Sequence, residues 1–260
     1  MTTGRAAADA VAGRVGEVGV VRPRPLPGAA LRLICFPYAG GGASVFASWP
    51  AGTGPDIEVC AVQLPGRESR LGQRPFQDVR TLVSAVEAGL GGLLDEPFAL
   101  FGHSMGALVA FEFARRLAAR GRPAPAHLFV SARPAPHLPR PWPRAHLLPD
   151  DQLIDRIRQI GGTPAQVLAD ARLMRLVLPV LRADFAVNDG YVHRPGPLLD
   201  CPVTALGGRD DPEAPPRVLE AWARHTTGPF RLHRFDGGHF YLREHRDDLL
   251  RVLRESLTGR

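Results

Sequence analysis

The sequence contains no lysine, so all 32 of its basic side chains are arginine. Together with 28 glycines and 26 prolines among 260 residues, this bias suggests a GC-rich coding sequence rather than selection for a nucleic-acid surface. The arginines are scattered and do not cluster with aromatic residues, which argues against nucleic-acid binding. The formal net charge of +6 at pH 7 still favours acidic partners through long-range attraction.

Cysteine is scarce, and long apolar runs are missing. Cys35, Cys60 and Cys201 are odd in number, and each lies in an apolar, strand-like segment. We interpret them as buried free thiols in a reducing compartment, and we expect neither a metal site nor a bound cofactor. No apolar run is long enough to span a membrane, and residues 1–12 lack the apolar core of a signal peptide. The sequence therefore predicts a cytoplasmic protein that does not contact membranes.

A serine between two glycines stands out in the segment 97–116. Residues 98–101 form an apolar run typical of a buried strand, and residues 107–117 have the three- and four-residue apolar spacing of a helix. Between them lies Gly102-His103-Ser104-Met105-Gly106, a Gly-x-Ser-x-Gly pattern. Strand, turn and helix in this order indicate a nucleophile elbow, whereas the pattern alone could be a chance match on a buried turn. We therefore interpret Ser104 as a nucleophile.

The order of the other segments predicts the fold class. Strand-like segments are found at residues 31–36, 57–64, 98–101, 127–132, 202–208 and 230–235, with helical patterns between several of them. This order predicts an α/β fold with a mostly parallel central sheet flanked by helices. Residues 1–28 are rich in Ala, Gly, Arg and Pro and are expected to form a flexible tail, which leaves residues 29–260 as the domain.

The pattern changes at residues 134–197, where proline-rich links and helices occur without an evident strand. We interpret this segment as a helical insertion that acts as a lid. Residues 166–187 predict one long apolar helix that Pro179 kinks. Its apolar side could either pack on the core or form the wall of an acyl-binding chamber.

A serine hydroxyl needs a general base that is oriented by a carboxylate. Among the nine histidines, only His239 lies on a glycine-preceded loop after the last strand. The acid should follow the preceding strand, where Gly208-Arg209-Asp210-Asp211 offers two carboxylates. The Gly-x-x-Asp register favours Asp211, and Asp210 is the alternative.

A glycine-rich loop follows the first strand at residues 37–44. It has neither the lysine of a P-loop nor the spacing of a dinucleotide-binding loop. Placed before a nucleophile elbow, it is better interpreted as an oxyanion-hole loop. The N–H groups of Ala39 and Met105 are then the expected donors to the oxyanion.

Four segments together resemble the type II thioesterases that accompany modular polyketide and nonribosomal peptide synthases. They are Phe36-Pro37-Tyr38-Ala39-Gly40-Gly41, Gln63-Leu64-Pro65-Gly66-Arg67-Glu68, Gly102-His103-Ser104-Met105-Gly106 and Gly238-His239-Phe240-Tyr241. They occur in family order and span residues 31–257. The resemblance implies an α/β-hydrolase that removes stalled or unwanted acyl groups from the phosphopantetheine arm of carrier proteins. It also implies a catalytic triad at Ser104, Asp211 and His239, with Asp210 as the one ambiguity, and oxyanion donors at Ala39 and Met105.

The expected partner is an acyl or peptidyl carrier protein, and we expect the enzyme to act as a monomer. A basic surface would suit an acidic carrier, with Arg133, Arg140 and Arg144 as candidate contacts or simply solvated side chains. Three alternatives remain. The first is a general serine esterase for small free esters. The second is a chain-releasing thioesterase. The sequence begins at Met1 with no carrier-like segment upstream of the domain, and we take this as an argument against that alternative. The third is a non-catalytic carrier-binding protein, which an intact Ser, Asp and His set disfavours.

Overall fold

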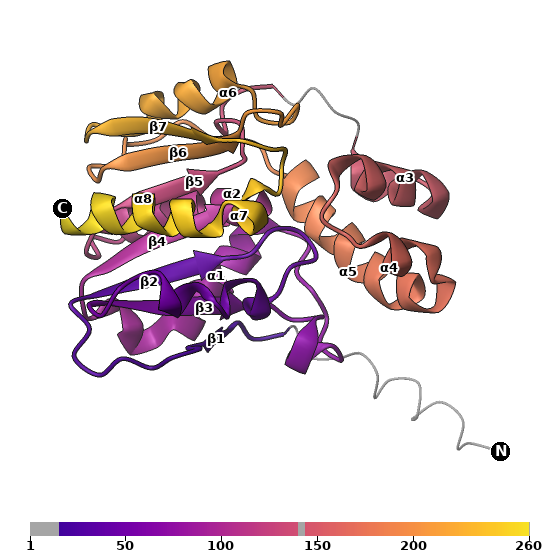
Figure 1. Ribbon diagram of the computed structural model, residues 1–260, viewed down its shortest axis with the longest axis horizontal. Helices are drawn as coiled ribbons and strands as arrows, with labels where there is room; N and C mark the ends of the chain where they lie inside the picture. The colour runs from indigo at the N-terminus through magenta and orange to yellow at the C-terminus, as the bar shows by residue number, and fades with distance from the viewer. Residues whose placement is uncertain (1–15, 140–143, 260) are drawn as a thin grey trace.

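The computed structural model describes residues 16–139 and 144–259. Seven strands form one sheet in the order β1-β3-β2-β4-β5-β6-β7 (Figure 1). The strands are β1 (Gly19–Val21), β2 (Leu31–Phe36), β3 (Ile57–Gln63), β4 (Phe98–His103), β5 (Leu128–Ser131), β6 (Val203–Gly208) and β7 (Phe230–Phe235). Neighbouring strands are parallel except for the antiparallel pair of β1 and β3. The predicted mostly parallel α/β sheet is therefore confirmed.

Helices cover both faces of this sheet (Figure 1). The helices of the described residues are α1 (Val79–Leu90), α2 (Met105–Ala119), α3 (Asp150–Ile160), α4 (Ala165–Ala169), α5 (Ala171–Asp189), α6 (Pro216–Glu220), α7 (Tyr241–Glu244) and α8 (Arg246–Thr258). Side chains alternate along each strand, so that successive residues enter different cores. On β2, for example, Ile34 packs with α1 and α2, whereas Leu33 packs with α8. Among the described residues, no helix is long and apolar enough to cross a membrane.

Strand β1 corrects the predicted tail at residues 1–28. Gly19–Val21 pair with residues 61–63 of β3, and Val18 is buried. Arg22 lies 2.6 Å from the carboxylate of Glu58, a β3 side chain that is only 1 % exposed. The tail was expected because three residues are too short to show a strand periodicity, and the pairing depends on a distant partner. Residues 1–15 of the predicted tail lie outside the described residues.

Helices α3, α4 and α5 lie between β5 and β6 in the chain and project beyond the sheet (Figure 1). The single helix predicted over residues 166–187 is wrong, because the chain forms α4 and α5 on either side of Asp170. The Asp170 carboxylate accepts the N–H groups of Arg172 and Leu173, and this cap begins α5. Pro179 lies inside α5. The insertion also has a small apolar core, which includes Leu153, Ile157, Met174, Leu178 and Leu181.

The three cysteines are free and buried, as the sequence indicated. Burial raises the pKa of Cys60 to about 11 and that of Cys201 to about 11. Burial also raises the pKa of Cys35 well above its ordinary value. All three are therefore kept as neutral thiols, which are poor nucleophiles and poor metal ligands.

Candidate active site

Ser104 stands on the sharp turn between β4 and α2. Its backbone has φ 54° and ψ −112°, and its N–H donates to the carbonyl oxygen of Ser131 at 2.8 Å. A Cβ on Gly102 would lie 2.1 Å from the carbonyl oxygen of Gly106, and a Cβ on Gly106 would lie 2.1 Å from that of Phe36. Only glycine fits at both positions, which is why the strand and the helix can approach so closely. The positive end of the α2 dipole is thereby directed at the serine.

His239 and Asp211 come together from the loops that follow β7 and β6. Nδ1 of His239 lies 2.9 Å from Oδ2 of Asp211. Asp211 is 3 % exposed and His239 is 8 % exposed, so water screens this contact little. Because Nδ1 is engaged by the carboxylate, Nε2 is the ring nitrogen left to exchange a proton with a substrate or with Ser104.

The structure also separates the two candidate carboxylates. Asp210 is exposed, and its backbone N–H donates to the carbonyl oxygen of Gly237 at 3.0 Å. Asp211 is buried and contacts His239. The geometry therefore favours Asp211 as the orienting acid, in the register that the sequence preferred.

His103, which precedes Ser104, lies in a buried network next to His239, the candidate general base. Its Nδ1 is 2.8 Å from the hydroxyl of Ser131, which in turn is 2.6 Å from the hydroxyl of Tyr241. Its ring centroid lies 5.3 Å from that of His239. Burial holds the pKa of His103 well below its ordinary value, so the ring is neutral and adds no positive charge beside His239.

The glycine-rich loop forms a tight turn beside Ser104. The N–H of Gly41 donates to the carbonyl oxygen of Tyr38 at 2.9 Å, and Gly40 has φ 78°. A positive φ at the third position is the mark of a type II turn, and it explains the glycine there. In the part of the chain that the structure describes, the N–H groups of Ala39 and Met105 have no protein acceptor. Both are thus available as donors to an oxyanion.

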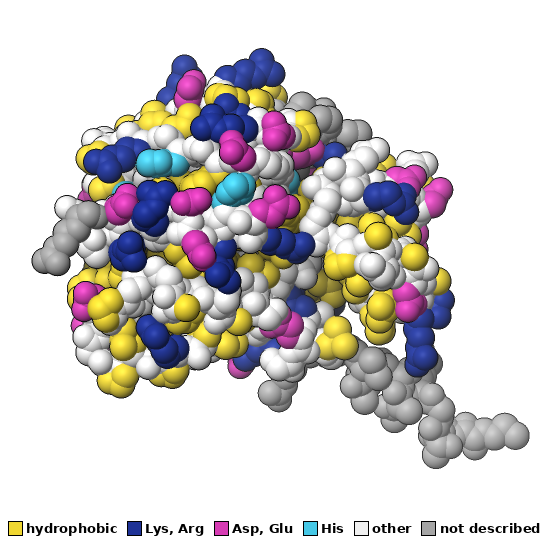
Figure 2. All heavy atoms as spheres, viewed as in Figure 1, with side chains coloured by type: hydrophobic (Ala, Val, Ile, Leu, Met, Phe, Trp, Pro, Cys, Tyr) yellow, Lys and Arg dark blue, Asp and Glu magenta, His cyan; other side chains and the backbone are white. Residues whose placement is uncertain are grey.

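Ser104 and His239 line one cavity of about 860 Å³. The glycine-rich loop contributes Tyr38 and residues 39–42 to its wall, and α5 contributes an apolar side made of Leu173, Leu176, Val177, Val180 and Leu181. Met174 and Leu178 of this helix pack inside the insertion, whereas Leu173, Leu176 and Val177 line the cavity. The helix thus packs on other residues and forms a cavity wall, and the binding of an acyl chain there stays a prediction. Figure 2 shows hydrophobic side chains at the surface of the insertion and where it meets the body.

Two arginines in and near the cavity have local roles that the sequence did not reveal. Arg133, a candidate carrier contact, donates to the side-chain oxygen of Asn188 at 2.6 Å and lines the cavity. Arg243 donates to the hydroxyl of Tyr38 and to the carbonyl oxygen of Gly162, both at 2.8 Å. Of the other candidate contacts, Arg144 is exposed, and Arg140 lies outside the described residues.

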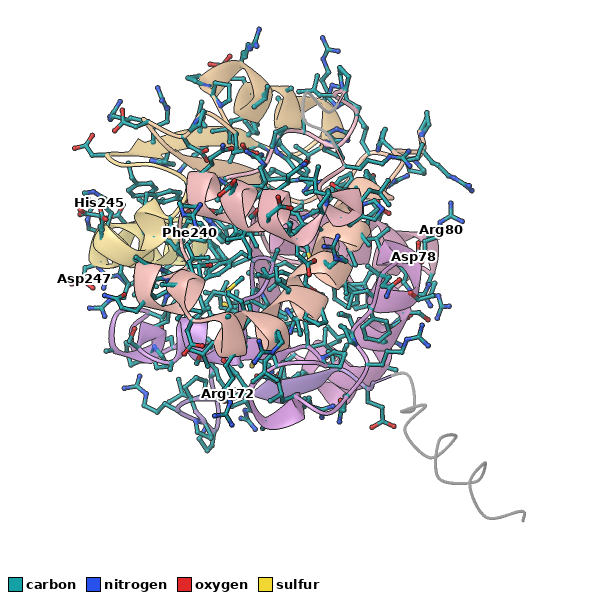
Figure 3. The ribbon with its side chains drawn as sticks, turned by 90° about the vertical axis from the view of Figure 1, so that its right-hand side faces the viewer. Asp78, Arg80, Arg172, Phe240, His245 and Asp247 are labelled. Carbon is teal, nitrogen blue, oxygen red and sulfur yellow. The ribbon has the colours of Figure 1, made fainter. Side chains whose placement is uncertain are left out.

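Arg243 links the insertion to the loops that carry Tyr38 and His239. Its guanidinium lies 5.1 Å from the ring centroid of Phe240, the residue after His239, and 5.7 Å from that of Tyr38. Seen from the insertion side, α3 to α5 lie in front of the sheet, and Phe240 lies at their edge (Figure 3). The insertion therefore covers the cavity and touches the loops that carry the candidate catalytic groups.

The sequence also gave no role to Arg67 or Asp184. They form a buried ion pair with N–O distances of 2.6 and 2.8 Å, although 117 positions separate them in the chain. Arg67 lies in one of the segments that carried the resemblance, but nothing in the pattern of α5 identified its partner. Only a long-range contact could reveal the pair.

Comparisons with known proteins show the family to which the chain belongs. The family model for the thioesterase domain matches residues 31–257. Gramicidin S biosynthesis protein GrsT of Aneurinibacillus migulanus is 43% identical over 88% of this chain and 90% of its own length. Thioesterase PikA5 of Streptomyces venezuelae is 44% identical over 86% of this chain and 79% of its own length.

Solved structures show the same likeness. The type II thioesterase BorB from the borrelidin biosynthetic cluster superposes with a TM-score of 0.84 at 43% identity, covering 94% of this chain and 98% of BorB. The chain therefore belongs to the thioesterase family and is a thioester hydrolase with the α/β-hydrolase fold.

Proposed function

We propose that this protein is an editing, type II thioesterase. It hydrolyses stalled or unwanted acyl groups from the phosphopantetheine arm of acyl or peptidyl carrier proteins during polyketide or nonribosomal peptide biosynthesis. One observation carries the proposal. Ser104, on its strained turn, and His239, paired with Asp211, line the same cavity, and this cavity has an apolar wall. Such a cavity suits an acyl chain, and the similar proteins GrsT and BorB belong to the biosynthesis of gramicidin S and of borrelidin.

The proposed mechanism uses only groups of this chain. Nε2 of His239 takes the proton of the Ser104 hydroxyl while the oxygen attacks the thioester carbonyl. The N–H groups of Ala39 and Met105 stabilise the oxyanion that forms, an effect worth about 3–4 kcal/mol per donor in other serine hydrolases. The protonated His239 then gives its proton to the departing pantetheine thiolate. A water molecule, deprotonated by His239, then attacks the acyl-serine ester. His239 returns this proton to the Ser104 oxygen as the acid leaves.

The other parts of the proposal follow from this chemistry. No bound cofactor or metal is needed, because the phosphopantetheine belongs to the substrate. The net charge of +6 complements an acidic carrier protein. Three buried free thiols suit a reducing cytoplasm, and we expect a monomer there.

The test is mass spectrometry of an acyl-loaded carrier protein incubated with the wild-type enzyme and with Ser104→Ala. We expect rapid loss of the acyl group with the wild-type enzyme and retention with the variant. If the acyl group survives both proteins while the wild-type enzyme cleaves a small soluble ester, the protein is a general esterase instead. Loss of the acyl group at equal rates with both proteins would exclude Ser104 as the nucleophile.

A further inference from the structure

Helix α5 of the insertion touches the oxyanion turn with two side chains that lie on one face of the helix. The carboxylate of Asp184 accepts the N–H of Gly40 at 2.7 Å. Three residues earlier, Leu181 packs so closely on the turn that a Cβ on Gly40 would lie 2.6 Å from its Cδ2 atom. Residues three apart on a helix share a face, so the two contacts act together on the same turn.

Arg67 completes this arrangement from the loop that follows β3. Its guanidinium pairs with both carboxylate oxygens of Asp184 and also donates to the carbonyl oxygen of Gly41 at 3.2 Å. Arg67 is 6 % exposed and Asp184 is 3 % exposed. Hydrogen bonds between ionised groups are stronger than neutral ones, and a planar, two-point pair fixes direction as well as distance. The pair therefore holds the turn at two successive residues, Gly40 and Gly41.

The contact to Gly40 has a specific conformational effect. Type I and type II turns differ mainly in the orientation of their central peptide, which here joins Ala39 to Gly40. In the observed turn the N–H of this peptide points at Asp184. The flipped peptide would direct the Ala39 carbonyl oxygen at the carboxylate, and the two negative groups would repel each other. Asp184 therefore stabilises the observed form of the turn. In this turn the Tyr38 carbonyl oxygen accepts the Gly41 N–H, so the N–H at the other end of the same trans peptide, that of Ala39, points away from the turn.

We propose that Asp184 and Arg67 are positioning residues that form the oxyanion donor of Ala39 only while α5 is docked on the body of the enzyme. Docking of the insertion would then close the acyl chamber and complete the catalytic turn in one movement. The inference rests on the proposed role of Ala39 in acyl transfer from Ser104. It assigns a positioning role in catalysis to a helix that also lines the cavity and packs within the insertion.

The test needs a variant that removes the pair without leaving a buried charge. The double variant Arg67→Met with Asp184→Leu replaces both ions by apolar groups of similar size, an exchange that proteins often tolerate without loss of stability. The single variant Asp184→Asn is a milder change, because its amide oxygen can still accept the Gly40 N–H. Arg182→Met is the matched control. Arg182 also lies on α5, but it bonds His146, Leu148 and Asp150 within the insertion.

Three quantities should be measured with a soluble acyl thioester and its analogues. They are kcat, the affinity for an amide analogue of the substrate, and the inhibition constant of a trifluoromethyl ketone, which forms an oxyanion with the serine. For the double variant we expect kcat to fall about 10- to 100-fold, because a misplaced oxyanion donor costs less than the roughly 100- to 1000-fold of a deleted one. The ketone should bind more weakly by the same factor, and the amide should bind as to the wild-type enzyme. Asp184→Asn should lose less than about tenfold, and Arg182→Met should keep both kcat and ketone affinity.

Several outcomes would overturn the inference. The first is an unchanged ketone affinity in a folded double variant. The second is an equal loss of ketone affinity and amide affinity in that variant. The third is a loss of ketone affinity in Arg182→Met as large as in the double variant. If the double variant does not fold, Asp184→Asn decides the matter, since it must weaken the ketone more than the amide. The soluble substrate keeps this test separate from the proposed function. If the enzyme cleaves the soluble thioester but does not deacylate carrier proteins, the editing role is refuted. The role of Asp184 and Arg67 is then still tested by the same kcat and ketone measurements.

Discussion

Asp211 holds His239 with only one of its two carboxylate oxygens. Oδ2 lies 2.9 Å from Nδ1 of His239, while Oδ1 accepts the N–H of Glu213 at 2.9 Å. The backbone contact fixes the plane of the carboxylate, so the histidine ring is held in one orientation and one tautomer. The neighbouring Asp210 is exposed to solvent.

This relationship predicts different effects for two adjacent substitutions. Asp211→Asn should lower kcat about 10³- to 10⁴-fold, because the amide cannot stabilise the imidazolium and favours the wrong tautomer. Asp210→Asn should leave kcat within about twofold of the wild-type value. Both are measured by steady-state hydrolysis of a soluble thioester. A larger loss in the Asp210 variant would show that the structure identifies the wrong acid.

The close approach of the elbow to β2 predicts a strong effect of one methyl group. Gly106→Ala would place a Cβ 2.1 Å from the carbonyl oxygen of Phe36, so the backbone must shift. We expect the free energy of unfolding to fall by about 2–4 kcal/mol, in the upper range for overpacking, together with most of the activity. Gly72→Ala is the control, because a Cβ there meets nothing within 4 Å. Urea unfolding of both variants tests this, and equal stabilities would contradict the described packing.

Removing the ion pair between Arg22 and Glu58 tests whether the segment before residue 28 stabilises the fold. Arg22→Ala leaves the buried Glu58 with the N–H of Leu26 at 2.9 Å and with Arg32 at 3.7 Å. Loss of the close cation should lower the free energy of unfolding by about 1–2 kcal/mol. Arg24→Ala, at an exposed position two residues away, should change it by less than about 0.5 kcal/mol. Identical unfolding curves for the two variants would mean that this segment does not stabilise the domain.

Buried histidines predict a loss of stability in mild acid. Burial lowers the pKa of His127 to about 4, and burial with the nearby His137 and His193 lowers that of His225 to about 4. The unfolded chain binds protons at these sites near the ordinary value of about 6.5, before the folded chain does. Stability is therefore full above about pH 6.5 and falls as the pH drops from there toward 4.

The variant His127→Gln isolates one of these sites, because glutamine can still reach the hydroxyl of Thr204, which lies 2.8 Å from Nε2 of His127. Between pH 7.5 and 5, we expect the variant to lose about 1–2 kcal/mol less of its free energy of unfolding than the wild type does. Urea unfolding at several pH values measures this difference. Parallel pH dependences of the two proteins would show that His127 is charged in the folded state or is not buried.

The central sheet and the elbow could be read from the sequence because their signals are local. A buried parallel strand is a continuous apolar run, and the turn at Ser104 needs glycine on both sides within five residues. His239 was identifiable for a similar reason, since it alone follows a glycine pair after the last strand. The order of strands then brings the loops after β6 and β7 toward the elbow, so the three segments of the site followed from chain order.

Other features depend on contacts between distant segments, and there the sequence predicted too little. Two adjacent aspartates have the same local pattern, and only the folded chain shows that Asp211 turns inward toward His239. Gly19–Val21 are too few to show an alternation, and their strand exists because β3 offers a free edge. The pairing of Arg67 with Asp184 joins two loops and a helix far apart in the chain. Local composition determines which backbone conformations a segment prefers, whereas a long-range pair forms only after folding has removed both partners from water.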